Sequence, residues 1–506
     1  MQITTYNAFA HAAQRFGQEQ ALVFGERSWT YARLAAEVGE WAGALARKGV
    51  RAGERTVMML GNRPEYVLAF LALQRLGAVV VPIDTRLQSA EVDHVLSDCE
   101  PRVVICDEDL LSTLEQTCAA DQGVRLVALP TLQASLETGV ACDPELASPS
   151  QPEADDTAVI LYTSGTTGAP KGACISHRNL LAVDALQRPH LGITHEDRVV
   201  MSLPLSHVAG LACGILTPLL AGASILILER FKAVEFLAAA ERHRMTYTLM
   251  VPTMYQLCLL QPDFARYDLS NWRIGHYGAA PMPSATISAL TSKLPQLRLV
   301  SGYGSTELTA SAIMMPLDAD QQQLMSLGKA LPGVELRVVD PATLQPVPTG
   351  KEGELWIRSP GVVSQYWRNE AATAASFVDG FWRSGDIVCQ DTEGYVYLMD
   401  RLKDMINRGG YKVFPAQVES VLSQCSDVLE AAVVGRHDAV LGERVHAFVQ
   451  SRSATLTPQQ LQAFCAAHLA DYAVPETFSI SPEPLPRNST GKLAKRELRS
   501  QLTPSA

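Results

Sequence analysis

Short apolar runs alternate with helical patterns through the N-terminal half of this 506-residue chain. Residues 57–60 and 78–82 are apolar runs of strand length, and residues 64–76 between them repeat apolar side chains at helical spacing. A further helix is predicted over residues 29–48, with Thr30 as its N-cap. Strands that alternate with helices in this way predict an α/β fold, with a mostly parallel sheet covered by helices.

After about residue 326 the pattern changes to short strands separated by glycine and proline turns, which indicates a small antiparallel or barrel-like piece. A last unit begins near Arg401 and combines two helical patterns with two strand patterns. We therefore expect an N-terminal domain of residues 1–400 and an α+β C-terminal domain of residues 401–506. The strand patterns fall at residues 334–339, 353–357, 394–398, 430–434 and 445–450, and the helical patterns at residues 416–423 and 458–469.

Residues 208–228 carry no formal charge and are numerous enough to span a bilayer. Gly210, Gly214, Pro218 and Gly222 interrupt the stretch, and the apolar run after the last glycine has the length of a strand. We interpret the stretch as a buried helix followed by a core strand, so no transmembrane span is expected.

Composition narrows the functional classes further. The net charge is −11, and without a basic stripe this argues against a nucleic-acid partner. The ten cysteines are scattered, which fits neither a zinc site nor a secreted disulfide framework. The first residues lack the basic and apolar regions of a signal peptide. We therefore expect a cytoplasmic protein with reduced thiols.

The most informative segment is residues 161–172, Leu-Tyr-Thr-Ser-Gly-Thr-Thr-Gly-Ala-Pro-Lys-Gly. Its glycines let the backbone turn tightly and bring N–H groups close to an anion. Its hydroxyls, from Tyr162 to Thr167, can donate to phosphate oxygens, and Lys171 adds a positive charge. The apolar run 158–161 places the loop at the end of a strand, where α/β proteins bind ligands. The spacing is not that of a Walker A motif, in which Ser or Thr follows the lysine.

This loop resembles the phosphate-binding loop of the adenylate-forming, or AMP-binding, superfamily, in its acyl-CoA synthetase and aryl-CoA ligase branch. Further motifs of the superfamily follow in order across nearly the whole chain. The resemblance implies a large N-terminal domain of two α/β subdomains plus a small β-barrel-like subdomain, with a mobile C-terminal domain. It also implies ATP, Mg²⁺ and the co-substrate coenzyme A. Within the loop it assigns nucleotide binding to Thr163, Ser164, Gly165, Thr166, Thr167, Gly168 and Lys171.

Residues 301–307 resemble the second nucleotide motif of the superfamily. By that resemblance Tyr303 stacks on adenine and Thr306 contacts the α-phosphate. Glu307 then binds Mg²⁺ together with Thr167, and a carboxylate suits so hard a cation. The nucleotide-binding residues of this motif are Gly302, Tyr303, Gly304 and Thr306.

Two motifs further on carry charged residues. Residues 382–386 resemble the motif whose aspartate, here Asp386, accepts hydrogen bonds from both ribose hydroxyls. Residues 400–404 match the hinge between the two domains. The resemblance implies that Arg401 reaches the ribose or the phosphates, and that the backbone of Lys403 turns when the C-terminal domain swings.

The C-terminal part holds the remaining ligase motifs. Gly409 and Gly410 resemble the loop that lines the tunnel for the pantetheine arm of coenzyme A. Residues 485–493 resemble the motif of the catalytic lysine, here Lys492, which would bridge the substrate carboxylate and the α-phosphate. Such charge neutralisation can raise a rate by about 10²-fold or more.

Two segments match the acyl site, and their substrate-binding residues are His207, Val208, Gly210, Tyr277, Gly278, Ala279 and Ala280. They offer no aspartate for the ammonium of an amino acid, and Gly302 stands where malonate-type members place an arginine. We therefore expect an apolar monocarboxylic acid, either fatty or aryl. Tyr277 either shortens the pocket or stacks on a ring, and His207 closes over the carboxylate or positions it.

Together the motifs predict an ATP-dependent acyl-CoA synthetase, an acid–thiol ligase that forms an acyl-adenylate and passes the acyl group to coenzyme A. The catalytic residues are Lys171, His207, Arg401 and Lys492. Free coenzyme A is the expected acceptor, because no carrier domain follows Lys492. The alternatives are a stand-alone adenylation enzyme that loads a carrier protein, and a nucleotide-binding regulator without catalysis. Lys492 argues against the regulator, since binding alone does not need it. Peripheral membrane contact and the choice between monomer and homodimer stay open.

Overall fold

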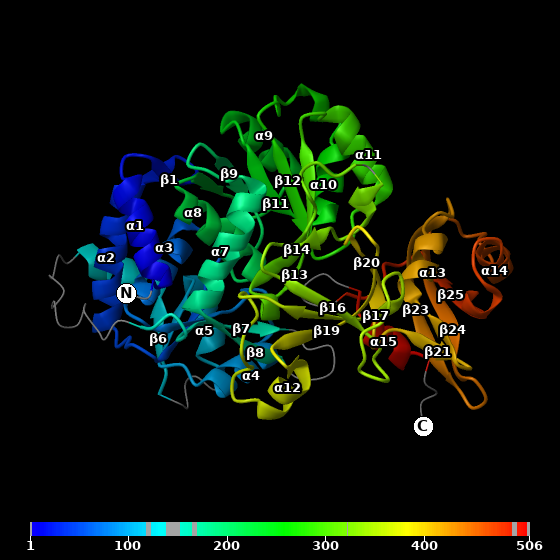
Figure 1. The fold of residues 1–506 in the computed structure, drawn as a ribbon. Helices are drawn as coiled ribbons and strands as arrows, with labels where there is room; N and C mark the ends of the chain where they lie inside the picture. The colour runs from blue at the N-terminus through cyan, green and yellow to red at the C-terminus, as the bar shows by residue number, and fades with distance from the viewer. Residues whose placement is uncertain are drawn as a thin grey trace. The chain divides into compact units, whose positions relative to one another are not determined.

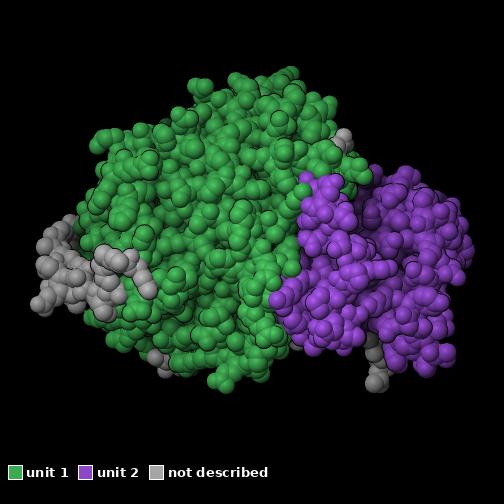
Figure 2. Space-filling view, in the orientation of Figure 1, with its two compact units in different colours: residues 1–336, 357–382 green, residues 337–356, 383–506 purple. Residues whose placement is uncertain are grey.

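The structure is a computed structural model, and Figure 1 shows its ribbon. It describes residues 3–117, 123–137, 152–163, 170–320, 322–487 and 493–502. The chain divides into two compact units, coloured separately in Figure 2: unit 1 is Met1–Leu336 with Ile357–Trp382, and unit 2 is Arg337–Trp356 with Arg383–Ala506. This division does not coincide with the predicted boundary at residue 400, and the hinge near Lys403 stays a prediction.

Unit 1 contains two mostly parallel sheets, as the alternating pattern predicts. Sheet A has the strand order β15-β14-β13-β12-β11-β9-β10-β1-β2, and sheet B has the order β6-β5-β3-β4-β7-β8. In sheet B only the pair β7–β8 runs antiparallel. The strands of sheet B are β3 (Arg55–Met59), β4 (Val79–Pro82), β5 (Val103–Cys106), β6 (Arg125–Ala128), β7 (Thr157–Thr163) and β8 (Lys171–Ser176). Those of sheet A are β1 (Gln20–Phe24), β2 (Arg27–Thr30), β9 (Arg198–Met201), β10 (Ser224–Ile227), β11 (Tyr247–Met250), β12 (Ile274–Gly278), β13 (Arg298–Ser305), β14 (Ala310–Met314) and β15 (Lys329–Ala330).

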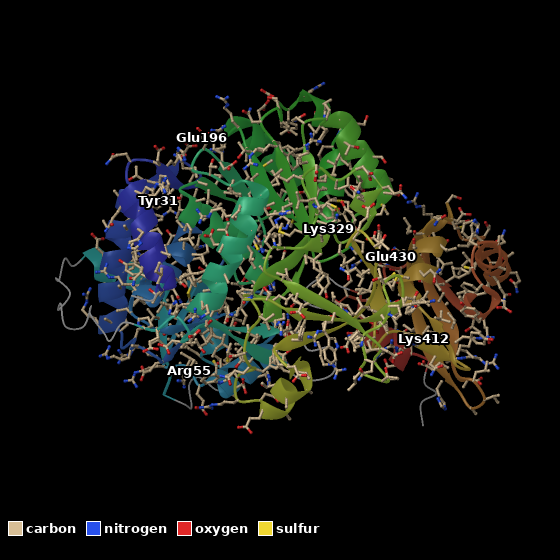
Figure 3. All side chains as sticks on the ribbon, viewed as in Figure 1. Tyr31, Arg55, Glu196, Lys329, Lys412 and Glu430 are labelled. Carbon is tan, nitrogen blue, oxygen red and sulfur yellow. The ribbon has the colours of Figure 1, made fainter. Side chains whose placement is uncertain are left out.

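Helices cover both sheets. The α-helices of unit 1 are α1 (Thr5–Arg15), α2 (Tyr31–Arg47), α3 (Pro64–Arg75), α4 (Ser89–Cys99), α5 (Leu111–Leu114), α6 (Leu129–Glu137), α7 (His177–Leu191), α8 (Thr217–Ala221), α9 (Ala233–Arg242), α10 (Pro252–Leu259), α11 (Ser284–Lys293) and α12 (Glu370–Ser376). The predicted N-cap of α2 is confirmed, because the Thr30 side chain accepts from the N–H of Arg33. The phenol of Tyr31, labelled in Figure 3, lies 3.1 and 2.8 Å from the main-chain oxygens of Leu219 and Ala223, which joins α2 to α8.

The uncharged stretch after residue 208 folds as a buried helical segment and a core strand, as predicted. It forms the π-helix η2 (Ala209–Leu216), then α8, then β10. A Cβ on Gly210 would lie 2.2 Å from the carbonyl oxygen of Pro204, and one on Gly214 would lie 2.4 Å from Cε of Met201. Only glycine allows the helix to pack this closely. Of the helices in the described residues, none combines the length and the hydrophobicity needed to cross a membrane.

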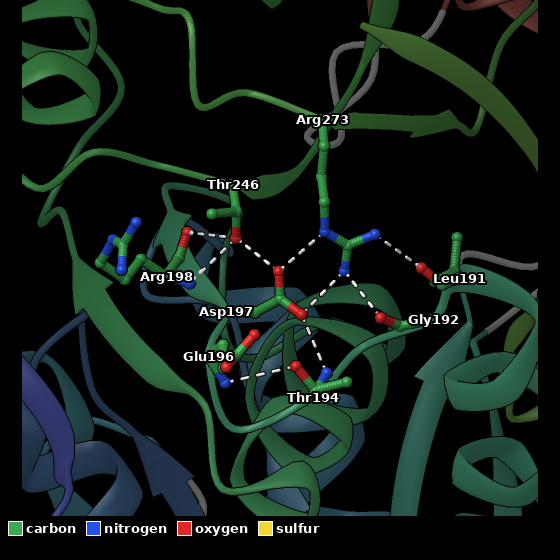
Figure 4. A network of polar contacts seen from close by, with 8 residues as sticks. All are labelled: Leu191, Gly192, Thr194, Glu196, Asp197, Arg198, Thr246 and Arg273. Atoms are coloured by element: carbon green, nitrogen blue, oxygen red, sulfur yellow. Dashed lines mark hydrogen bonds and ion pairs between the residues drawn. The ribbon is translucent and has the colours of Figure 1, made fainter. Parts of the chain in front are cut away.

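An ion pair with a buried carboxylate fixes the amino ends of the central strands of sheet A (Figure 4). The carboxylate of Asp197 accepts from the guanidinium of Arg273 at 2.7 Å, and also from Thr246 Oγ1 and from the N–H of Thr194. Arg273 donates in addition to the main-chain oxygens of Leu191, the last residue of α7, and of its C-cap Gly192. Since these residues precede β9, β11 and β12, the network aligns the starts of three parallel strands. The carboxyl ends of these strands, where α/β proteins bind ligands, lie at the other edge.

The later strands form two further sheets. Sheet C has the order β16-β17-β19-β18, with β20 paired to β19, and sheet D has the order β22-β21-β24-β23, with β25 paired to β24. The strands are β16 (Glu335–Val339), β17 (Glu352–Arg358), β18 (Phe377–Val378), β19 (Phe381–Gln390), β20 (Val396–Arg401), β21 (Ile406–Arg408), β22 (Tyr411–Val413), β23 (Val428–Asp438), β24 (Gly442–Ser451) and β25 (Thr477–Ser481). Sheet D packs with α13 (Pro415–Leu422) and α14 (Pro458–Ala466) around an apolar core, and α15 (Lys495–Ser500) lies against β23. This is the predicted α+β arrangement.

We expect the folded state to lose stability in mild acid because of His177, at the start of α7. The imidazole is buried and its Nδ1 accepts from the N–H of Thr5. Burial lowers the pKa of His177 from 6.5 to about 4. The unfolded chain therefore binds more protons between these values, and stability present above pH 6.5 is lost as the pH falls toward 4. At pH 5 the loss is about 2 kcal/mol.

Thermal unfolding at pH 7.5 and pH 5 of the wild type and of His177→Gln checks this. The variant should be less stable at pH 7.5 and should lose less between the two pH values, because glutamine does not titrate. Equal losses in the two proteins would show that His177 is not a source of acid sensitivity.

Candidate active site

Two of the predicted site residues, Lys171 and Glu307, meet at a tyrosine in unit 1. Glu307 lies on a short 3-10 helix, Thr306–Leu308, directly after β13. Its Oε1 accepts a hydrogen bond of 2.8 Å from the phenol of Tyr366. Nζ of Lys171, the first residue of β8, lies 4.8 Å from the centroid of the same ring, a cation–π distance. A predicted phosphate ligand and a predicted magnesium ligand are thus neighbours through one aromatic side chain.

Sequence reasoning missed Tyr366. The residue is buried, and it lies in the segment between β17 and α12. Burial, followed by the nearby Glu307 carboxylate, raises the pKa of the Tyr366 phenol far above its ordinary value, so the phenol stays a donor at neutral pH. The only sequence signal was the adjacent aromatic pair Tyr366-Trp367, which has no distinctive spacing.

The ends of the predicted phosphate loop are well defined. Thr163 and Lys171 face each other across the β7–β8 pair, and Thr163 Oγ1 lies 3.4 Å from the carbonyl oxygen of Lys171. The hydroxyl of Tyr162, a predicted phosphate donor, is hydrogen-bonded to the carboxylate of Asp98. The predicted ligands Ser164, Gly165, Thr166, Thr167 and Gly168 lie outside the described residues, so their roles stay predictions.

The remaining residues of the second nucleotide motif follow sheet A to its carboxyl end. Gly302, Tyr303 and Gly304 are in β13, and Thr306 begins the 3-10 helix that also carries Glu307. Gly304 has no room for a side chain, since a Cβ there would lie 1.9 Å from the carbonyl oxygen of Ala310. The strand therefore holds these residues in a rigid backbone, where α/β proteins bind ligands.

His207 is held by a carboxylate that the sequence did not single out. Its Nε2 lies 3.1 Å from Oδ2 of Asp84, and the guanidinium of Arg86 lies 2.7 Å from the same oxygen. Burial alone would raise the pKa of Asp84, but hydrogen bonds from Arg86 and His207 hold it well below its usual range. Asp84 is therefore a permanent anion that fixes the orientation of the His207 ring, which fits a positioning role.

The predicted acyl-site residues lie in two separate parts of unit 1. Val208 and Gly210 lie at the beginning of η2, while Gly278 ends β12 and pairs with Gly302 of β13. The next residue, Ala279, has a φ of +68°, a strained conformation for a residue with a side chain. Such strain often accompanies functional sites. Ala280 follows it and is exposed.

Tyr277 lies in the core, on the opposite face of β12 from Gly278. The side chain is buried, and its hydroxyl lies 3.4 Å from the main-chain oxygen of Leu324. Burial raises its pKa to about 12. On the other face of β12, the His276 side chain is buried, and its Nδ1 lies 3.0 Å from the phenol oxygen of Tyr247. Its Nε2 would lie only 2.3 Å from a Cβ on Gly302, so the imidazole fills the space that a side chain at residue 302 would need.

The ribose-binding candidates lie in unit 2, on neighbouring strands. Asp386 of β19 pairs with Arg401 of β20 in the antiparallel ladder, and Oδ1 of Asp386 lies 2.6 Å from Nε of Arg401. The Asp386 side chain is buried while that of Arg401 is half-exposed. Gly385, which precedes the aspartate within β19, has a φ of +68°, a conformation that glycine adopts without strain. The two predicted nucleotide ligands are therefore brought together.

The predicted pantetheine loop is a tight hairpin. Arg408 of β21 pairs with Tyr411 of β22, so that Gly409 and Gly410 form a two-residue turn. Both glycines have positive φ, +59° and +95°, as a type I′ turn requires. The guanidinium of Arg408 is anchored at 2.7 Å from Glu476. Lys403 is exposed in the turn before β21. Lys492 lies outside the described residues, so its role stays a prediction.

Comparison with known proteins agrees with these motifs. The profile of the AMP-binding enzyme family matches residues 9–367, and that of the AMP-binding enzyme C-terminal domain matches residues 417–492. Feruloyl-CoA synthase of Amycolatopsis sp is 33% identical over 483 residues, which cover 95% of each chain. A long-chain-fatty-acid–CoA ligase of Mycobacterium tuberculosis is 32% identical over 93% of each chain.

The fold gives the same result. The structure of ATP-bound MatB from Rhodopseudomonas palustris superposes with a TM-score of 0.90 over 99% of each chain, at 30% sequence identity. The predicted α/β class is thereby confirmed. Since the family profile covers well over half of the sequence and the relatives align over nearly all of it, this chain belongs to the AMP-binding enzyme family.

Proposed function

We propose that this chain is an ATP-dependent acyl-CoA synthetase that activates an apolar monocarboxylic acid as its acyl-adenylate and transfers the acyl group to coenzyme A. The observation that carries the proposal is the meeting of Lys171 and Glu307 at Tyr366. A cation and an anion that both contact one buried tyrosine suit the binding of a metal–polyphosphate. The match to the AMP-binding enzyme family supports ATP as that polyphosphate.

In the first half-reaction, a carboxylate oxygen attacks the α-phosphorus of ATP, and pyrophosphate leaves. Two anions meet in this step, so the protein must supply positive charge where negative charge develops. Lys171 would neutralise phosphate oxygens from β8, and Lys492 would bridge the carboxylate and the α-phosphate. Glu307, with Thr167, would hold Mg²⁺ through hard oxygen ligands, and the ion would neutralise charge on the polyphosphate.

The nucleoside is held by other residues. Asp386 would accept hydrogen bonds from the two ribose hydroxyls, and Tyr303 would stack on adenine. Nε of Arg401 lies 2.6 Å from the Asp386 carboxylate and holds it in place. The same arginine is half-exposed and retains donors for the ribose or a phosphate.

In the second half-reaction, the thiol of coenzyme A attacks the acyl carbonyl carbon of the adenylate. The C–S bond forms, the C–O bond to the phosphate breaks, AMP leaves, and the thiol proton goes to solvent. The hairpin turn at Gly409 and Gly410 presents no side chains, which suits the passage of a narrow pantetheine arm past its backbone.

The acyl site favours an apolar acid without a second charge. A side chain at residue 302 would collide with the His276 ring, so the arginine that a dicarboxylate requires has no space here. Burial lowers the pKa of His276 to about 3, so this imidazole is neutral at working pH and does not replace that arginine. Relatives that are named for aryl and for fatty acids are about equally similar to this chain. Both classes of acid are therefore included in the screen that follows.

A screen of carboxylic acids for AMP release, with and without coenzyme A, tests the proposal. Medium-chain and long-chain fatty acids, cinnamates and benzoates should be compared with malonate and an amino acid. We expect AMP release that requires both an apolar monocarboxylic acid and coenzyme A, with little turnover of malonate. Release that needs a carrier protein instead of coenzyme A would favour the loading enzyme, and release with no dependence on an acid would refute the ligase assignment.

A further inference from the structure

The ends of the predicted phosphate loop are held by a helix that belongs to none of the motifs above. Thr163 and Lys171 are partners in the β7–β8 ladder, so the two ends of the loop lie side by side at one place. The helix α4 of the same unit faces this place through two side chains, His94 and Asp98. These are four residues apart, so they project from one face of the helix.

Each side chain contacts one end of the loop. The carboxylate of Asp98 accepts from the phenol of Tyr162, next to Thr163. Nε2 of His94 lies 3.0 Å from the carbonyl oxygen of Pro170, next to Lys171. Since a carbonyl oxygen only accepts, Nε2 of His94 carries the proton. The edge of the His94 ring also faces the Tyr162 ring, with centroids 6.4 Å apart.

Trp367 connects the helix α4 to the strand β8. Its indole N–H donates to the main-chain oxygen of Asp98 at 3.1 Å, and its main-chain N–H donates to the carbonyl oxygen of Gly172 at 2.7 Å. A Cβ on Gly172 would lie 2.6 Å from Cγ2 of Ile160, so the glycine lets the strands pack closely beneath these contacts. The neighbour of Trp367 in sequence is Tyr366, which contacts Lys171.

We propose that His94 and Asp98 are positioning residues for ATP, which fix both ends of the phosphate loop and so preset Thr163 and Lys171 for the phosphates. The inference rests on the proposed function only in taking ATP as the ligand. Phosphate-binding residues that are held in place before the ligand arrives lose less conformational freedom on binding, and the affinity is higher for that reason. The loss of one such hydrogen bond should weaken ATP binding by roughly five- to tenfold.

The affinity of MgATP, measured by isothermal titration calorimetry on the full chain, tests this. His94→Phe keeps an aromatic ring against Tyr162 and removes the donor, whereas His94→Gln restores a donor. The matched control is His190→Phe, because Nε2 of His190 makes the same kind of contact, 2.9 Å from the carbonyl oxygen of Met315, away from the loop. Melting temperatures are recorded for all proteins.

We expect the dissociation constant for MgATP to rise about five- to tenfold in His94→Phe, to return to within about twofold of wild type in His94→Gln, and to stay unchanged in His190→Phe. The His94→Phe and His190→Phe proteins should lose similar thermal stability. Equal affinity in wild type and His94→Phe, or equal weakening in both phenylalanine variants, would overturn the positioning role. A wild type that binds ATP but releases no AMP with any acid would refute the ligase, while the affinities would still decide the role of His94.

Discussion

Replacing Lys492 by alanine should abolish acyl-adenylate formation while ATP binding persists. The reason is that its ammonium is the charge assigned to the pentacoordinate transition state, where the carboxylate and the α-phosphate approach each other. Removal of one such group from a site of developing charge lowers a rate by about 10²- to 10³-fold. The measurement is acid-dependent pyrophosphate release in a single turnover, together with the affinity for MgATP.

Lys351→Ala is a suitable control, because it removes an exposed lysine from the same unit. It should leave both quantities unchanged. Pyrophosphate release at a near-normal rate in Lys492→Ala would show that the adenylation step does not use this ammonium.

Glu307→Gln should lower the rate of adenylation by about 10²-fold and shift the Mg²⁺ dependence to higher concentrations. Glutamine keeps the shape of the side chain and can still accept from Tyr366 through its amide oxygen. The substitution therefore removes the charge that we propose binds the metal, and it leaves the neighbouring hydrogen bond. The measurement is the rate of pyrophosphate release as a function of Mg²⁺ concentration.

Tyr366→Phe separates the contribution of the Glu307 charge from that of its hydrogen bond with Tyr366. It removes the 2.8 Å hydrogen bond to Glu307 and keeps the ring near Lys171, so a loss of about tenfold or less is expected. An Mg²⁺ dependence in Glu307→Gln identical to that of the wild type would contradict the assignment of Glu307 as a metal ligand.

The fold followed closely from the sequence where local patterns are strong. Residues 64–76 form α3 within one residue of the prediction, because a proline at the first helical position and a continuous apolar face specify it. The uncharged stretch after residue 208 was also interpreted correctly, since its glycines mark close packing. Its π-helical form could not be predicted, because hydrophobic spacing does not distinguish hydrogen bonds to residue i+5 from those to i+4.

The candidate site was predictable only where chemistry is concentrated in short segments. Lys171 and Glu307 stand in such segments, and the structure brings both to Tyr366. By contrast, Asp84 orients His207 from 123 residues away in sequence, and Tyr366 is 59 residues from Glu307. Contacts of this kind depend on tertiary packing, which leaves no local pattern.

The most direct test of the account is acid-dependent exchange of labelled pyrophosphate into ATP in the absence of coenzyme A. Exchange requires that the acyl-adenylate forms reversibly on the enzyme before any thiol is present. We predict exchange with an apolar monocarboxylic acid, none without acid, and none in Lys492→Ala. If the wild type released acyl-CoA and AMP yet showed no exchange without coenzyme A, the proposed acyl-adenylate intermediate would be contradicted.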